Sequence, residues 1–182
     1  MKFTETGFDG LFIVEPEIFE DQRGYFMETF NQEVFRKAGI VFNPVQDNES
    51  ESVKGVIRGL HYQLRPFDQA KLIKVAEGKI LDVALDLRTA SKTYGKWFGI
   101  ELDSEARRQL FIPRGFAHGF SVLSNSAVIQ YKCDNFYKPQ FERGILATDP
   151  SLAIDWKINI SEAIISEKDL KHPYFRNAEN NF

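Results

Sequence analysis

The chain has little of what several protein classes require. It has one cysteine in 182 residues, so no internal disulfide can form and nothing indicates an oxidising compartment. No apolar run approaches the roughly 20 residues that span a bilayer. The formal net charge is −3, whereas binding to nucleic acid needs a concentrated excess of basic residues. We therefore expect a soluble, cytoplasmic protein that binds neither nucleic acid nor membranes.

The composition is instead that of a β-protein. Phenylalanine occurs 17 times, aromatic residues form 14% of the chain, and short strand-like runs are separated by Gly, Pro, Asn or Asp. The clearest run is 81–88, where leucine or valine occupies every second position. We expect one domain over residues 1–182, mainly β, with the jelly-roll form of a β-sandwich or barrel and a few short helices.

The individual elements follow from the same runs. Strands are expected at 11–15, 25–30, 71–76, 79–87, 95–102, 109–112, 119–123 and 127–132, with an extended segment at 42–52. Residues 16–24 are expected to form a polar turn region. The pair Glu77-Gly78 is a hairpin signal between two of the strands. A helix is expected from Gln32 to Ala38, closed by Gly39, and a short terminal helix is expected at I-S-E-K-D-L-K.

Two apolar stretches carry an unusual number of polar side chains. The first, 55–74, contains Arg58, His61, Gln63 and Lys71. The second, 112–131, contains P-R-G-F-A-H-G-F, with His118, and ends at Tyr131. Two histidines on two apolar strands predict a barrel with a polar-lined interior.

Arg58 and His61 would point to opposite faces of an ideal strand, since side chains alternate. Gly59 lies between them, where a β-bulge would reverse the alternation. We predict an irregularity at Gly59 that puts Arg58 and His61 on one face. The alternative is a plain strand with Arg58 solvated outside.

The motifs also carry a resemblance. P-R-G-F-A-H-G-F resembles the second half of the cupin signature, in which a turn delivers a histidine into a jelly-roll barrel. The ordered set D-Q-R-G-Y-F-M-E, Q-D-N-E-S, R-G-L-H-Y-Q, Q-A-K-L, D-V-A-L-D-L-R, Y-K-C-D-N-F-Y-K-P and S-E-K-D resembles the dTDP-4-dehydrorhamnose 3,5-epimerase family over essentially the whole chain. The resemblance implies a cupin-like fold.

The histidine pattern argues against a metal. Most cupins bind one through a His-x-His pair, a carboxylate and a later histidine, but Gln63 stands where the second histidine of the pair would be. Only His61 and His118 remain in the two motifs, and His172 is expected to be a surface residue. We expect neither a metal nor a cofactor.

The resemblance implies an isomerase of dTDP-L-rhamnose biosynthesis. Its substrate would be dTDP-4-dehydro-6-deoxy-D-glucose, which is epimerised at C3 and C5 to dTDP-4-dehydro-L-rhamnose. Both carbons flank the C4 ketone, so loss of either proton gives an enolate, and reprotonation from the other face inverts the centre. This chemistry needs a base, a group that stabilises the enolate oxygen, and an acid across the ring.

The resemblance assigns these roles to four residues. His61 would be the base, and Asp169 of S-E-K-D would orient its ring. Lys71 would stabilise the enolate, and Tyr131 would be the acid. Taken without the resemblance, Asp169 reads as a carboxylate at a helix N-terminus, Lys71 as an edge-strand lysine and Tyr131 as a buried tyrosine.

The resemblance also implies substrate-binding residues. Arg23, Arg58 and Lys168 suit a diphosphate; Tyr137 would stack on thymine; and the others are Phe26, Glu28, Gln46, Asp47, Asn48, Gln63, His118 and Glu142. The segment from Arg23 to Glu28 would reach into a neighbouring subunit, which implies a homodimer. The chain departs from the family pattern at Phe136, Ala147 and Thr148, and these differences concern the nucleotide end rather than the reacting groups.

Two alternatives stay open. Related enzymes epimerise only C3 or only C5, or move the keto group between C3 and C4, with similar residues. A cupin of a different class would bind a sugar nucleotide without catalysis, and that reading predicts loss of the His61 and Asp169 pair, which is intact here.

Overall fold

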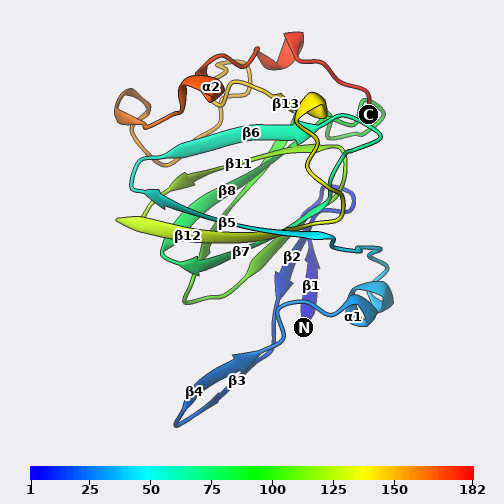
Figure 1. Ribbon diagram of the computed structural model, residues 1–182, viewed down its shortest axis with the longest axis vertical. Coiled ribbons are helices and arrows are strands. Elements are labelled where there is room, and N and C mark those ends of the chain that lie inside the picture. The colour runs from blue at the N-terminus through cyan, green and yellow to red at the C-terminus, as the bar shows by residue number, and fades with distance from the viewer.

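Two antiparallel sheets face each other across an apolar core in the computed structural model, which describes residues 1–182 (Figure 1). The first sheet has the order β1 (Lys2–Glu5), β2 (Phe12–Glu15), β10 (Gln109–Ile112), β7 (Lys71–Glu77), β12 (Ser126–Cys133) and β5 (Gln46–Val53). The second has the order β13 (Glu142–Gly144), β6 (Ile57–Gln63), β11 (Phe116–Val122), β8 (Lys79–Asp86) and β9 (Trp97–Asp103). The predicted β-fold of jelly-roll type is confirmed.

The core is divided by the second sheet, whose strands are apolar on both faces. Ile80 and Ala84 of β8 point into the cluster between the two sheets, whereas Leu81 and Val83 point to the opposite side. There they meet the C-terminal segment, which contributes Trp156 and covers the outer face of this sheet (Figure 1). Burial of each isoleucine, leucine or valine side chain among these stabilises the fold by about 1.5–3 kcal/mol. The segment after β13 is therefore an integral layer of the fold.

The helices are short, as expected. α1 (Gln32–Lys37) begins after Asn31, whose side chain accepts hydrogen bonds from the backbone of the first turn, and it buries Phe35 against the outer face of the first sheet. α2 (Glu167–Leu170) is capped in the same way by Ser166. Three 3-10 helices complete the set: Pro139–Phe141, Ile160–Glu162 and Phe175–Asn177. No helix is long and apolar enough to cross a membrane.

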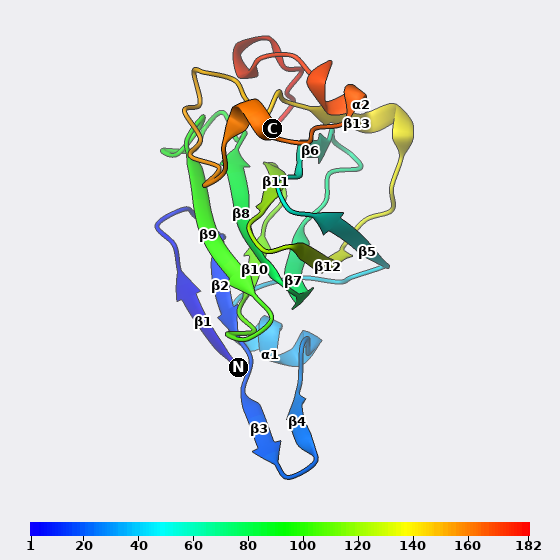
Figure 2. The same cartoon turned by 90° about the vertical axis from the view of Figure 1, so that its left-hand side faces the viewer.

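A hairpin of β3 (Ile18–Asp21) and β4 (Gly24–Met27) projects from the body of the molecule (Figures 1 and 2). The predicted turn region at 16–24 was therefore too long, because residues 18–21 form β3 and Gly24 begins β4. Charged side chains obscure this strand in the sequence, since both of its faces lie outside the core. We call residues 18–27 the arm.

The predicted hairpin at Glu77-Gly78 is wrong. β7 and β8 belong to different sheets: Glu77 pairs with Val128 of β12, and Lys79 pairs with Asp103 of β9. Gly78 makes the corner with a φ of +78°, and a Cβ there would lie 2.1 Å from the carbonyl oxygen of Ser126. The glycine allows the chain to turn sharply between β7 and β8. Which sheet each strand joins was decided by the burial of the two faces of that strand.

The predicted irregularity at Gly59 is confirmed. His61 pairs with His118 of β11, and Arg58 pairs with Phe120, so β6 has one more residue than β11 between the two pairs. Gly59 has a φ of +113° and packs against the backbone of β11, leaving no room for a side chain. Arg58 and His61 consequently share the face of β6 that points between the sheets.

Candidate active site

A cavity of about 290 Å³ opens at one end of the space between the sheets. The predicted site residues that line it are Gln46, Asn48, His61, Gln63, Lys71, Tyr131, Tyr137 and Glu142. Strand register explains this convergence: Asn48 lies opposite Tyr131 and Lys71 lies opposite Cys133, all with side chains on the inner face of the first sheet. The residues come from five strands and from the loop after β12 that carries Tyr137.

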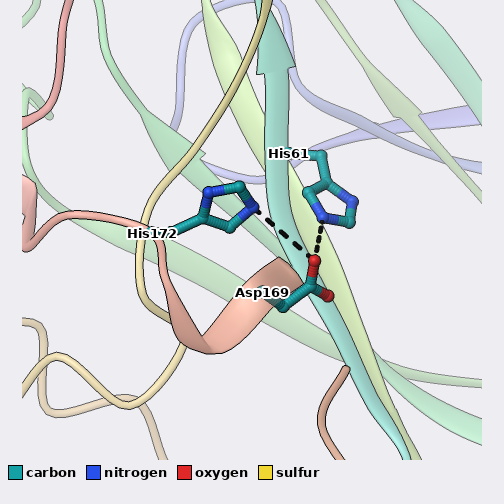
Figure 3. Close-up of side chains that lie close together, drawn as sticks. All are labelled: His61, Asp169 and His172. Carbon is teal, nitrogen blue, oxygen red and sulfur yellow. Dashed lines mark hydrogen bonds and ion pairs between the residues drawn. The ribbon is translucent and has the colours of Figure 1, made fainter. Parts of the chain in front are cut away.

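His61 and Asp169 form a hydrogen-bonded pair at the wall of this cavity (Figure 3). Nε2 of His61 lies 2.8 Å from Oδ1 of Asp169, and the backbone N–H of Gly59 donates to Oδ2 at 3.1 Å. Burial alone would raise the pKa of Asp169, but the hydrogen bonds from His61 and Gly59 outweigh it and hold this pKa below its ordinary value. An ionised Asp169 only accepts hydrogen bonds, so Nε2 of His61 carries the proton. The lone pair of neutral His61 is then on Nδ1.

Lys71 and Tyr131 lie together on the inner face of the first sheet. Nζ of Lys71 lies 5.9 Å from the centre of the Tyr131 ring. Burial lowers the pKa of Lys71, and the nearby Asp82 and Glu142 partly counter it. Burial raises the pKa of Tyr131, so its hydroxyl keeps its proton near neutral pH. The pair offers an amino group and a protonated phenol to the same cavity.

Gln63 holds the loop that carries Tyr137. Its Nε2 donates to the carbonyl oxygen of Phe67 at 2.6 Å, and its Oε1 accepts from the backbone N–H of Lys138, also at 2.6 Å. The side chain is 4% exposed. Both ends of the amide are therefore hydrogen-bonded to the backbone. Gln63, which stands where most cupins have the second metal-binding histidine, stabilises the loop instead.

Tyr137, Glu142 and Lys168 form a polar group at the mouth of the cavity. Oε2 of Glu142 accepts hydrogen bonds from the Tyr137 hydroxyl at 2.8 Å and from Nζ of Lys168 at 2.5 Å. Burial of Glu142 would raise its pKa, but these two partners outweigh it and lower the pKa. The ring of Tyr137 is about half exposed, so a flat ligand can reach it.

Three predicted residues lie near the cavity without lining it. Arg58 shares the inner face with His61 but donates to the hydroxyl of Ser52 at 3.0 Å. Asp47 lies on the opposite face of β5 from its neighbours Gln46 and Asn48, and pairs with Lys132 at 3.0 Å. His118 is buried between the sheets, with Nε2 2.7 Å from Oδ1 of Asp82.

Three further predicted residues lie outside the cavity, on or just after the arm. Arg23 is at its tip and pairs with Asp21, whereas Phe26 lies on β4 opposite Phe19, near the base of the arm, with its side chain exposed. Glu28 follows the arm and accepts from Asn31 at 2.9 Å. Within one chain these residues do not meet the other predicted binding groups.

The prediction for His172 is wrong. Its side chain is 13% exposed, and Nε2 lies 3.6 Å from Oδ1 of Asp169 (Figure 3). The available signal was its position three residues after Asp169, just beyond the end of α2. The sequence also gave no indication that Gln69 and Cys133 line the cavity or that Asp82 lies beside His118. Burial raises the pKa of Cys133, which keeps it a thiol.

A jelly-roll cavity that presents a His-Asp pair, a lysine and a protonated tyrosine contains the kinds of group that proton transfer next to a carbonyl requires, which is the chemistry of an isomerase. The sequence model described as dTDP-4-dehydrorhamnose 3,5-epimerase matches residues 5–177. The chain belongs to this family of isomerases.

Relatives of known name and structure agree with this assignment. The dTDP-4-dehydrorhamnose 3,5-epimerase of Methanothermobacter thermautotrophicus is 52% identical over 169 residues, which cover 92% of this chain and 91% of the relative. The crystal structure of the enzyme from Elizabethkingia anophelis superposes with a TM-score of 0.95 at 48% identity, covering 100% of this chain and 99% of that one. The Legionella pneumophila enzyme, solved with dTDP-4-keto-L-rhamnose, has a TM-score of 0.92 at 44% identity, with 97% and 93% covered.

Proposed function

We propose that this protein epimerises dTDP-4-dehydro-6-deoxy-D-glucose at C3 and C5 to dTDP-4-dehydro-L-rhamnose, within dTDP-L-rhamnose biosynthesis. The observation that carries the proposal is the His61 and Asp169 pair, which shares one cavity with Lys71 and Tyr131. Family membership and the relative solved with dTDP-4-keto-L-rhamnose support the choice of substrate.

The proton steps follow from the hydrogen bonding. With Nε2 held by Asp169, Nδ1 of His61 accepts the proton from C3 or C5, and the ion pair with Asp169 stabilises the imidazolium that results. The electrons move to the C4 oxygen, where the ammonium of Lys71 stabilises the negative charge. Tyr131 donates a proton to the other face of the carbon. No electrons leave the substrate, so we propose no cofactor.

The remaining polar groups bind the nucleotide. Tyr137 stacks on the base, and Lys168 and Arg58 supply positive charge to the diphosphate. Gln46, Asn48 and Glu142 complete the walls. Gln63 acts indirectly, by holding the loop that carries Tyr137. His118 and Asp82 lie behind the sugar. Asp47 contributes through its backbone on β5, since its side chain faces away from the cavity.

Arg23, Phe26 and Glu28 join the site through a second copy of the chain. We propose a homodimer in which each arm enters the partner's site. Three aromatic side chains of the arm support this: Phe19, Tyr25 and Phe26 are 56%, 54% and 69% exposed. An isolated hairpin with this apolar content is marginally stable in water unless it packs against another surface.

We also propose that residues 1–182 form one domain and that the enzyme is cytoplasmic. The free thiol of Cys133 stays reduced in the cytoplasm.

Incubation with the 4-keto substrate in heavy water tests the proposal. Deuterium is followed at C3 and C5 by NMR while a 4-keto reductase traps the product. Incorporation at both carbons with an L-configured product is expected. The absence of incorporation would place the chain among binding proteins and refute the proposal.

A single-site epimerase is the second candidate, and one comparison favours it. A 3'-monoepimerase from Streptomyces bikiniensis, solved with dTDP-quinovose, has a TM-score of 0.86 at 34% identity, covering 92% of this chain and 85% of that one. The fold is thus shared with an enzyme named for reaction at one carbon. Deuterium at one carbon only would select this candidate, or a 3,4-ketoisomerase if the keto group has moved.

A further inference from the structure

His172 adds a third metal-ligating side chain to the His61 and Asp169 pair. One ligand atom from each of His61, Asp169 and His172 lies within 4.8 Å of the other two. Oδ1 of Asp169 is shared, at 2.8 Å from His61 and 3.6 Å from His172 (Figure 3). We propose that these three atoms bind one divalent ion of the zinc class, and that the bound ion blocks the catalytic base. The second half of this inference rests on the proposed function.

The distances suit such an ion. Zinc binds histidine nitrogen at about 2.0–2.1 Å and carboxylate oxygen at about 2.0–2.2 Å, so two tetrahedral ligands lie about 3.4 Å apart. The observed separations of 2.8 and 3.6 Å fall on either side of this value. Two histidines and a carboxylate are also a ligand set that zinc favours, with a fourth position left for water. Small ring movements are sufficient to seat the ion.

Nε2 of His172 makes no other polar contact. It is buried and has no hydrogen-bond partner, since 3.6 Å is too long for a hydrogen bond to Asp169. A buried polar atom without a partner is unfavourable and calls for an explanation. The nitrogen is directed toward Asp169 and next to His61, whose ring it meets edge-on with centroids 5.6 Å apart. A shared ion would satisfy it.

The fold holds His172 in this place. Its ring lies on Gly144, where a Cβ would come within 2.3 Å of the imidazole. Gly144 lies directly opposite His61 in the pairing of β13 with β6. The backbone beyond His172 is fixed by the hydrogen bond from Leu146 to Pro173, at 2.9 Å. Ligands held by packing in this way are preorganised for metal binding. This arrangement is separate from the metal set of cupins, because Gln63 is engaged elsewhere.

The ion would switch off the base by changing its tautomer. In the resting pair, Nε2 of His61 carries the proton and Nδ1 carries the lone pair. A metal at Nε2 takes the lone pair on that atom, so the proton moves through solvent to Nδ1 and no proton is gained or lost by the ring. Protonated Nδ1 cannot accept a proton from the substrate. The site opens to ions through His61, whose side chain is 31% exposed.

The test uses zinc chloride on the intact protein, with binding measured by calorimetry and activity measured as deuterium exchange. We expect one zinc per chain and inhibition that a chelator reverses. His172→Leu removes a ligand, and Gly144→Ala displaces the ring while all three ligands remain. Each is expected to weaken zinc binding by at least about tenfold, since even an outer partner of a ligand contributes 10–100-fold. Lys171→Ala, at the neighbouring exposed position, is expected to bind zinc as wild type does.

The outcomes separate this site from the proposed function. Equal zinc binding by wild type and His172→Leu, or the absence of binding to wild type, would overturn the site even in a fully active epimerase. Zinc that saturates the site without inhibition would overturn the tautomer argument. A chain that binds zinc as expected but never exchanges substrate protons would retain the site and refute the epimerase.

Discussion

His61 and Asp169 are 108 positions apart in the sequence, and their side chains meet with Nε2 2.8 Å from Oδ1. Asp169 is 4% exposed, and its other oxygen is held by the backbone of Gly59. The glycine that bends β6 to aim His61 is thus the residue that also fixes its carboxylate partner. The tautomer of His61 follows from this bond, and the catalytic proposal depends on it.

Replacement of His61 by asparagine should abolish exchange of the substrate protons. Loss of a positioned base lowers the rate by about 10²–10⁴-fold. Binding of dTDP should be nearly unchanged, because the proposed nucleotide contacts come from other residues. Exchange is measured by NMR in heavy water and dTDP binding by calorimetry. Retained exchange would remove His61 from the mechanism, whereas loss of both readouts would indicate a folding defect.

Tyr131→Phe should separate proton removal from inversion. His61 remains, so deuterium should still enter the substrate, but the donor on the other face is missing and formation of inverted product should fall by about 10²-fold or more. The trapped product is analysed for configuration alongside deuterium content. Tyr94→Phe, a half-exposed tyrosine that packs on Phe175, is the control and should behave as wild type. Normal inversion in Tyr131→Phe would exclude the tyrosine as the acid.

A charge on the arm should separate the subunits. Phe26→Asp places a carboxylate where we propose an apolar contact with the partner, so light scattering should show a monomer and activity should fall with it. Val41→Asp changes a more exposed apolar residue, at 79%, away from the arm and should remain dimeric. A monomeric wild-type protein with full activity would contradict the arm exchange.

Asp86 should make the fold sensitive to acid. It is fully buried, and its carboxylate accepts from Arg88, Ser91 and Thr93 at distances of 2.6 to 2.9 Å. Burial alone would raise the pKa of Asp86, but these bonds outweigh it and lower the pKa. A folded pKa below the ordinary value of about 3.9 contributes stability that is complete above about pH 5. That stability is lost as the pH falls through the folded pKa.

Asp86→Asn should therefore lower the free energy of unfolding by about 3 kcal/mol at pH 7, because it removes the buried carboxylate that pairs with Arg88 at 2.8 Å. The difference from wild type should shrink below about pH 4, because the carboxylate of the unfolded wild-type chain takes up a proton there, and it should vanish as the pH falls through the lower folded pKa. Urea unfolding at pH 7, 5 and 3.5 measures this. Asp155→Asn, at an exposed ion pair with Lys157, should unfold at the wild-type urea concentration. A pH-independent difference at Asp86 would contradict the assignment.

Much of the site could be predicted because its residues lie in local motifs. The bulge at Gly59 followed from the spacing of Arg58 and His61 around a glycine, since strand parity is a local rule. Because side chains alternate along β5, Asp47 points to the opposite face from Gln46 and Asn48. The motif alone did not reveal this difference. His172 was missed because its burial depends on Gly144 and His61, both distant in the sequence.

By itself the sequence determined the class of fold and the family, and it predicted most of the groups that we propose react, because alternation, glycine positions and ordered motifs act over short distances. Only the tertiary structure decided that β7 and β8 join different sheets, that the arm projects, and that His172 shares an oxygen of Asp169. Each of these depends on which apolar face is covered by which distant segment. Burial is a property of the assembled chain, and no local pattern contains it.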